Sequence, residues 1–260
     1  MRRRVVVSVE TTDLTVNGGT PVDLTLMVLN WNLEVVLEYS AYIIPETPLS
    51  EGAVNSHSMD MEWLRRYGRP SYTVFAEVWQ FLAQATDGGP LSILGNDVGF
   101  QYQALQNWFI HHGYPDSLKN FLTPTGSDIE MIAQYLNEVY EYAGGLDACL
   151  FTDFRTGKPS VSVHAQCKAL GVDLKNRDAR PSRSKALTIL DIYKSHISSV
   201  GEDFKTVMDG VTVETDTFSD NPHCSKCGAV AEVDSSYVYE GALKLDCVLC
   251  GTSNIVQEIK

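Results

Sequence analysis

Two Cys-x-x-Cys pairs near the C-terminal end constrain the fold of this chain more than any other feature of its sequence. Cys224 and Cys227 form the first pair, Cys247 and Cys250 form the second, and 19 residues separate the pairs. This spacing is typical of a tetrahedral Zn²⁺ site with four thiolate ligands. Because cysteine fills all four positions, we expect a structural rather than a catalytic zinc. We read no secretory signal at the start of the sequence, so disulfide bonds, the alternative, are disfavoured.

The residues around these pairs differ in pattern from the rest of the chain. Helical periodicity ends near residues 201–205, and β-type runs flank the cysteines beyond that point. A segment of about 55 residues has too little core to be stable alone, and a structural metal compensates for this. We therefore predict two domains, residues 1–203 and a small β-rich, zinc-ribbon-like module of residues 204–260.

Within the first domain, the hydrophobic pattern predicts both strands and helices. Apolar runs at 5–9, 22–29 and 33–44 are separated by turn residues, which favours an antiparallel meander of three strands. A fourth, short strand is expected at 91–94, and the segment 144–160 is glycine-rich and irregular. Helical spacing of apolar residues predicts an α/β domain with helices at 72–85, 100–112, 129–142, 163–170 and 184–200.

The net charge limits the kinds of partner that the chain can bind. It carries 33 acidic and 20 basic residues, a formal charge of −13. Nucleic-acid binding gains most of its affinity from Lys and Arg that neutralise phosphates, so this balance disfavours it. One local basic run is the exception, and it is our candidate nucleic-acid-binding surface: Lys175, Arg177, Arg180, Arg183 and Lys185. No run approaches the roughly 18 apolar residues of a membrane span, so we expect a cytoplasmic protein with no membrane partner.

Several short segments, in order, resemble the motifs of one enzyme family. Val5 to Leu14 is similar to the first motif of the DEDD-type 3′–5′ exonucleases, the DnaQ-like family, which ordinarily reads Asp-x-Glu-Thr-Thr-Gly-Leu. Residues 94–101 resemble the second motif, which usually ends in Phe-Asp, and residues 184–189 fall where His-x-Ala-Leu-x-Asp is expected. Weaker likeness is found at 43–45, 55–59, 127–129 and 167–172, so the resemblance covers roughly residues 4–200. It implies an RNase H-like fold, a mixed sheet with flanking helices.

The resemblance also implies a catalytic site, which this sequence does not complete. Such exonucleases use four carboxylates to hold two divalent metals and a histidine as general base. Only Glu10 matches, and the other positions hold Ser8, Gln101, Ser184 and Ile189. One carboxylate cannot supply the charge or the oxygen ligands that two Mg²⁺ ions require. We therefore expect no catalytic residues and no Mg²⁺ or Mn²⁺ at this degenerate site.

Three displaced acids are alternatives as metal ligands. Asp97 precedes Gln101 by four residues and would lie near the same face if the helix started early, whereas Asp13 follows the first strand in a turn. Asp191 lies two residues after Ile189, about 200° round a helix, so it should face away from the site.

Three functions remain open. The first is a non-catalytic, exonuclease-like scaffold, a pseudoenzyme that binds a protein partner of nucleic-acid metabolism. Residues 206–260 contain three lysines against nine acids, which favours a basic protein as that partner. The second is nucleic-acid binding without cleavage, through the basic run. The third is a residual metal-dependent 3′–5′ exonuclease that uses Glu10 with a displaced acid such as Asp97.

Overall fold

The structure is a computed structural model of the chain. It describes residues 3–15, 19–86, 89–144, 149–153, 155–173, 180–210, 236–239, 242–246 and 253–258. The chain divides into two compact units, residues 2–201 and 202–260, which are described separately. The elements of the first unit are β1 (Arg4–Thr11), β2 (Pro21–Leu29), β3 (Val35–Ile44), α1 (Glu51–His57), α2 (Met61–Tyr67), β4 (Arg69–Pro70), α3 (Ser71–Ala85), β5 (Leu91–Gly95), α4 (Val98–His111), the 3₁₀ helix η1 (Leu118–Asn120), β6 (Leu122–Asp128), α5 (Ile129–Gly144), α6 (Val163–Leu170) and α7 (Pro181–Gly210), which continues into the second.

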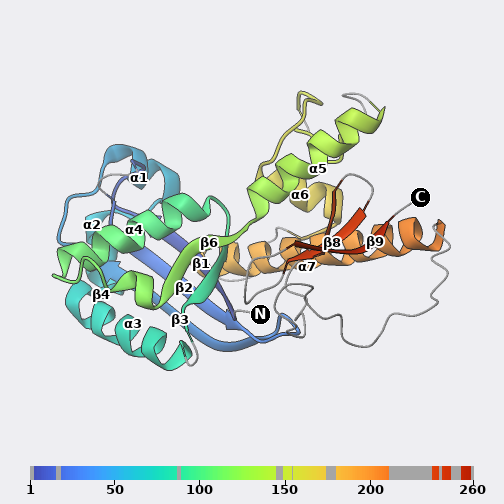
Figure 1. Cartoon of the computed structure of the whole chain (residues 1–260). Coiled ribbons are helices and arrows are strands. Elements are labelled where there is room, and N and C mark those ends of the chain that lie inside the picture. Colours follow the sequence, from blue (N-terminus) through green and yellow to red (C-terminus); the bar gives the residue numbers. More distant parts are fainter. Residues whose placement is uncertain are drawn as a thin grey trace. The chain divides into compact units, whose positions relative to one another are not determined.

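A mixed six-stranded sheet forms the centre of the first unit, with strand order β4-β3-β2-β1-β5-β6. The strands β1, β2 and β3 pair antiparallel, which confirms the predicted meander. The strands β5 and β6 continue the sheet in parallel with β1. This mixed sheet with helices on both faces is the predicted α/β architecture (Figure 1).

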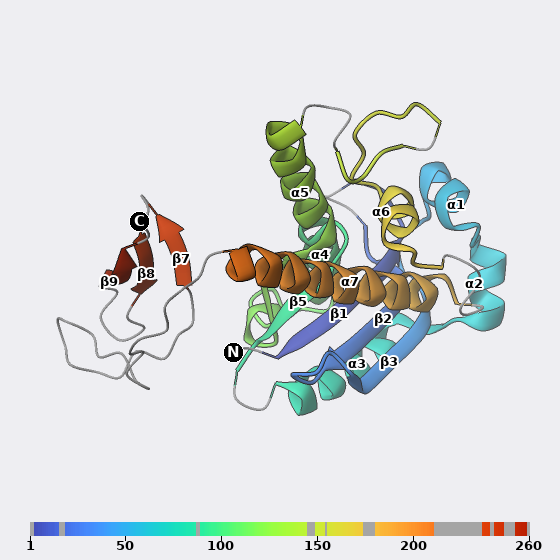
Figure 2. The ribbon, with the colours of Figure 1, turned by 90° about the vertical axis from the view of Figure 1, so that its right-hand side faces the viewer.

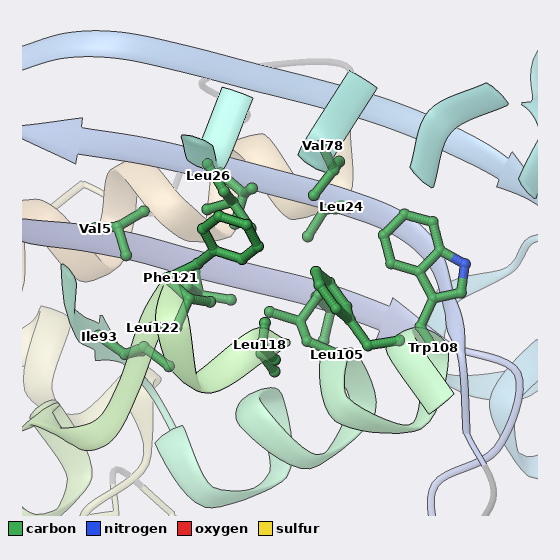
Figure 3. Close-up of a cluster of buried hydrophobic side chains, with 14 of the residues drawn as sticks. Val5, Leu24, Leu26, Val78, Ile93, Leu105, Trp108, Leu118, Phe121 and Leu122 are labelled. Atoms are coloured by element: carbon green, nitrogen blue, oxygen red, sulfur yellow. The ribbon is translucent and has the colours of Figure 1, made fainter. Parts of the chain in front are cut away.

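One face of the sheet packs against α3 and α4. Side chains that alternate along β1 and β2, such as Val5 and Leu24, meet Val78 of α3 and Leu105 and Trp108 of α4 (Figure 3). Among the described residues, this apolar cluster contains 23 buried side chains, several of them aromatic rings in contact. Burial of apolar surface on this scale is the main stabilising contribution to the unit.

The opposite face packs against α5, α6 and α7. Val6 of β1 and Met27 of β2 point to this side, where they contact Ile129 of α5, Cys167 of α6 and Ile189 of α7. Figure 2 shows α7 crossing the sheet on this side. This cluster holds 11 buried residues, and polar side chains take over from it toward the end of β1.

The helices and strands differ from the sequence-based expectation in several places. The helices α1 and α2, of seven residues each, and the strands β4 and β6 were not predicted. The last helix, expected over 184–200, begins at Pro181 and runs to Gly210, so the expected loss of helical structure near residue 201 was wrong. Pro181 fits the first turn of a helix because that turn has no partner for its N–H groups.

In the second unit, the described strands form a three-stranded antiparallel sheet in the order β7-β8-β9. The strands are β7 (Ser236–Tyr239), β8 (Ala242–Asp246) and β9 (Ser253–Glu258), with Tyr237 opposite Lys244 and Asp246 opposite Ser253. The four cysteines of the predicted zinc site lie outside the described residues. None of the helices in the described part of the chain combines the length and the apolar character needed to cross a membrane.

Candidate functional site

The candidate site lies where β1 and β2 face the first turns of α7. Side chains alternate between the two faces of a strand, so Ser8 and Glu10 share the side of Val6, which faces α7. In the antiparallel register, Glu10 is opposite Asp23 and Ser8 is opposite Thr25. Two carboxylates and two hydroxyls therefore project from neighbouring strands toward the same helix.

An ion pair with Lys185 holds the carboxylate of Glu10. The Lys185 Nζ lies 2.5 Å from the Glu10 Oε1, and the Glu10 side chain is largely buried whereas the lysine is half-exposed. An ammonium group thus stands against the only carboxylate that matches the exonuclease motif. The positive charge is supplied by the chain itself, from the second turn of α7.

Asp23 is the second carboxylate of the site, and it is fully buried. The backbone N–H of Ser182 donates to its Oδ2 at 2.9 Å, and the Arg180 Nη1 lies 3.8 Å from its Oδ1. The Arg180 guanidinium also lies over the Tyr42 ring, 4.0 Å from the ring centre. Burial raises the pKa of Asp23 to about 6, against the lowering effects of the Ser182 hydrogen bonds and of Arg180. Asp23 therefore anchors the beginning of α7 to the sheet.

Hydroxyl groups occupy the space beside Asp23. The Thr25 Oγ1 lies 2.8 Å from the Ser182 Oγ and 2.9 Å from the Ser40 Oγ, which links β2 to both α7 and β3. Across the strand pair, the Ser8 Oγ is buried and makes no hydrogen bond with any described residue. Serine at position 8 thus contributes neither charge nor a hydrogen bond where the motif ordinarily has an aspartate.

The side chain of Gln101, at the start of α4, forms hydrogen bonds with two backbone groups. Its Oε1 accepts a hydrogen bond from the Val9 N–H at 3.0 Å, and its Nε2 donates to the Asn96 carbonyl at 3.0 Å. Both polar atoms of this buried amide are therefore engaged in holding α4 against β1. The remaining motif positions differ in character, because Ile189 is buried in the apolar cluster of α7 and Ser184 is partly buried.

His57 closes the site at the end of β1. The Met59 N–H donates to its Nδ1 at 3.1 Å, so the Nε2 carries the proton and donates to the Thr11 carbonyl at 3.2 Å. Burial lowers the pKa of His57, so the neutral ring is favoured. This histidine ties the end of α1 to the strand that carries Glu10.

The three displaced acids do not gather around Glu10. The Asp97 Oδ1 accepts from the Phe100 N–H at 3.2 Å and so caps α4. The Asp13 Oδ1 accepts from the Thr15 N–H at 3.2 Å within a turn, while Asp191 is partly exposed on α7 and is not part of the buried cluster of that helix. Within the described ranges, no group of three or more His, Cys, Asp or Glu side chains is placed to share a metal ion. The donor set at Glu10 therefore does not fit the two-metal centre of the exonuclease motif.

The basic run of the sequence is partly described. Arg183 lies 2.5 Å from the Glu38 carboxylate through its Nε, and Arg180 and Lys185 face Asp23 and Glu10. Each of these three cations thus has an acidic neighbour on the sheet. Lys175 and Arg177 lie outside the described residues.

Sequence reasoning missed Asp23 and Ser182. Asp23 sits in an otherwise apolar, buried strand, Val-Asp-Leu-Thr-Leu-Met-Val-Leu, and a lone carboxylate in such a run is a signal for a buried, partnered acid. The partnership with Ser182 spans 159 residues, so no local pattern could have indicated it.

Comparisons with known proteins address the fold. No protein-family model matches the sequence, and no curated protein matches it. The solved structures that it resembles include E. coli exonuclease I in complex with a dT13 oligonucleotide, at 18% identity and a TM-score of 0.61 over 80% of this chain and 44% of that one. A complex of the same exonuclease with SSB-Ct matches at 15% identity and a TM-score of 0.60 over 80% and 44%.

The aligned region spans less than half of the exonuclease I chain. Identity at this level reports the arrangement of strands and helices and not the reaction. The likeness agrees with the sheet order and the helices on both faces described above. The chain therefore has the mixed α/β, RNase H-like fold of E. coli exonuclease I.

Proposed function

We propose that this chain is a catalytically inactive, exonuclease-like protein that works as a scaffold for a protein partner of nucleic-acid metabolism. The observation that carries the proposal is the ion pair between Lys185 and Glu10. A divalent metal at Glu10 would have to displace this ammonium group and would find no carboxylate at Ser8, Gln101 or Ile189. The neighbouring carboxylate, Asp23, is already bound to the Ser182 N–H and faces Arg180. Mg²⁺ binds with near-ideal octahedral oxygen geometry, which this set does not provide.

The contacts of Gln101 support the same proposal. An amide is neutral, and both ends of this one are engaged with backbone groups of β1 and of residue 96. To reach a metal, the side chain would have to give up two hydrogen bonds in a buried place, where unpaired polar groups cost about 1–3 kcal/mol each. The site is thus built to hold α4 and α7 on the sheet.

The test is degradation of a single-stranded DNA oligonucleotide labelled near its 5′ end, with Mg²⁺ and then with Mn²⁺. We would compare the purified chain with its Glu10→Ala and Lys185→Ala variants, and we expect no shortening of the DNA by any of them. The Lys185→Ala variant asks whether a freed Glu10 restores metal chemistry. Metal-dependent shortening by the wild-type chain that Glu10→Ala abolishes would overturn the proposal and support the residual exonuclease.

Nucleic-acid binding without cleavage is the second candidate function. Two observations bear on it, since exonuclease I is known in complex with oligonucleotides, while Arg180, Arg183 and Lys185 of this chain each face a carboxylate. Binding of a labelled oligo-dT, measured by fluorescence anisotropy at about 50 and 200 mM salt, separates the two functions. Binding that falls steeply with salt supports this candidate, because phosphate contacts release counterions.

We also propose that Cys224, Cys227, Cys247 and Cys250 bind a structural Zn²⁺ in the second unit. The proposal is supported by their spacing and by the sequence position of Cys247 and Cys250 between β8 and β9. Metal analysis of the purified chain should find one equivalent of Zn²⁺, and Cys247→Ser should lower it and unfold the second unit while the first stays folded. Full zinc content in that variant would refute this site. The cytoplasmic location remains a prediction.

A further inference from the structure

The helix α5 exposes large apolar side chains on the side opposite to its packing against the first unit. Its buried side carries Ile129 and Ala133, which pack against the rest of the first unit. On the other side, four large side chains have between 46% and 96% of their surface exposed, namely Met131, Tyr135, Val139 and Tyr142.

These four residues are spaced by four, four and three positions, so they line up along the helix. At about 100° per residue they fall within a sector of about 80°, opposite the sector that contains Ile129 and Ala133. We call them the α5 stripe. Figures 1 and 2 show α5 running outward from the end of β6, so that much of its length stands clear of the sheet. A helix that is apolar on two opposite faces has one face left to cover.

An acidic groove runs beside the α5 stripe. Its volume is about 490 Å³, and it lies between α5 and residues 159–162. Three glutamates of α5 line it, Glu130, Glu138 and Glu141, and no basic residue is among the residues that line it. On the helix, Glu138 is next to the stripe in rotation, about 20° from Met131. The sequence of α5 contains no Lys, Arg or His at all.

We infer that the α5 stripe and the acidic groove together form a docking surface for a basic, amphipathic helical segment of another protein. The apolar side of such a segment would cover Met131, Tyr135 and Tyr142, and its Lys and Arg side chains would enter the groove. This assignment rests on the proposed function, because it supposes that the chain acts by binding a protein.

Charge argues for this occupant against the other candidates. The chain carries a formal charge of −13, so a second copy would bring further negative charge to the glutamates. Residues 206–260 of the same chain, with three lysines against nine acids, would be repelled in the same way. Nucleic acids and anionic lipid surfaces are disfavoured for the same reason. A basic partner gains from both the charge and the apolar contact.

The test uses a labelled 18-residue peptide of leucine and lysine, with the leucines at helical spacing, titrated with the full-length chain in a fluorescence anisotropy experiment. We expect binding at low micromolar concentration. The double variant Met131→Ser/Tyr135→Ser should weaken it at least tenfold, because aromatic residues at the centre of an interface contribute most of the affinity. The variant Glu138→Gln/Glu141→Gln should weaken binding and reduce its dependence on salt.

Matched controls separate the docking surface from general attraction to an acidic protein. Tyr72→Ser removes an aromatic side chain of similar exposure on α3, 67% against 66% for Tyr135, and Glu51→Gln removes an acid elsewhere. Both should bind the peptide as the wild type does, and circular dichroism should show all variants folded. Equal loss of affinity in the Tyr72→Ser and stripe variants would overturn the inference, as would full binding by the stripe variant.

Five further measurements test the other occupants and the dependence on the proposed function. A peptide with its leucines replaced by serine should bind at least tenfold more weakly, whereas anionic vesicles and a single-stranded oligonucleotide should not bind at the stripe. Sedimentation should show that the chain does not self-associate through the α5 stripe. Self-association that Met131→Ser/Tyr135→Ser abolishes would instead assign the surface to a second copy. DNA degradation by the wild-type chain that Glu10→Ala abolishes would refute the proposed function. Peptide binding that does not depend on the α5 stripe would refute this inference alone.

Discussion

The two faces of the central sheet use different chemistry to hold their helices. Against α3 and α4 the contact is apolar and aromatic, with Trp108 and Phe109 fully buried among the strands. Against the first turns of α7 the contact is made by charges and hydroxyls, including the Glu10–Lys185 pair and the buried Asp23. An apolar face contributes mainly stability, whereas a buried polar face depends on every partner being present. The second face also carries Ser8, Glu10 and Ile189 of the exonuclease motifs, whereas Gln101 belongs to α4.

Under the proposed function, the second face holds helices where an active exonuclease would hold metals. At one motif position, Ile189 is part of the apolar cluster. At another, the side chain of Gln101 accepts a hydrogen bond from the backbone of Val9 in β1. At Glu10 the carboxylate remains and takes an internal cation. In the proposed function, these three positions serve packing and hydrogen bonding within an exonuclease-like fold.

The largest expected effect breaks the apolar face. Trp108→Ala removes a side chain that contacts Phe75 edge-on at 5.3 Å between ring centres and donates to the Ser71 hydroxyl at 2.9 Å. We expect the free energy of unfolding to fall by about 3–5 kcal/mol, measured by urea denaturation. Trp31→Ala, an exposed tryptophan, should change it by less than about 0.5 kcal/mol. Similar losses in the two variants would contradict the arrangement of this face.

The next effect is a pH dependence that arises from Asp23 on the polar face. The pKa of Asp23 is raised to about 6 in the folded protein from an ordinary value of 3.8, so the folded state binds a proton that the unfolded state has released. The contribution of Asp23 to stability therefore falls as the pH rises from about 4 to about 6, by about 3 kcal/mol. Asp23→Asn should remove this slope, measured by urea denaturation across that range. A slope that persists unchanged in the variant would show that other groups cause it.

A smaller effect isolates the ion pair at the motif position. Lys185→Ala leaves the largely buried Glu10 carboxylate beside Asp23 without its cation. Because the lysine is half-exposed, we expect the free energy of unfolding to fall by only about 1–2 kcal/mol. Thermal denaturation measures this change. Adding Glu10→Gln to Lys185→Ala should recover most of the loss, since it removes the unpaired charge. Failure of the double variant to recover would argue that the lysine acts through packing.

The smallest effect concerns the outer edge of the same face. Arg183→Ala removes the pair with Glu38, in which both side chains are about one-third exposed. A pair this close to solvent contributes about 0.2–1 kcal/mol, and salt screens it. The difference from the wild type should therefore shrink between about 50 and 500 mM salt in the same denaturation experiment. A loss of unfolding free energy that stays constant with salt would mean that the ion pair is better shielded from solvent than the exposed fractions of its side chains indicate.

The sequence was most informative where one physical effect dominates. Continuous apolar runs between turn residues predicted β1 to β3, and helical spacing predicted α3. The strand β6, Leu-Thr-Pro-Thr-Gly-Ser-Asp, has no such pattern, because an edge strand needs few apolar residues and tolerates proline. Gly126 in this strand passes so close to Ile93 that a Cβ would lie 2.0 Å from the Ile93 carbonyl oxygen, a constraint that only the packed sheet makes visible.

The candidate site could be predicted by position but not by pairing. The structure has Ser8 and Glu10 on β1, Gln101 on α4 and Ile189 on α7. The partner of Glu10 is 175 residues away, and it was assigned in the sequence to a nucleic-acid-binding surface. Which cation pairs with which carboxylate depends on how α7 crosses the sheet, and that crossing has no local signature.

The carboxylate of Asp128 accepts hydrogen bonds from the starts of two helices. Asp128 accepts from the Val98 N–H at 2.7 Å at the start of α4 and from the Glu130 N–H at 2.9 Å at the start of α5. The starts of the two helices are thus bound by the same side chain, and α5 extends outward from the end of β6 (Figure 1). The start of α5 is therefore tied through one carboxylate to the amino end of α4, three residues before the amide that binds the backbone of β1.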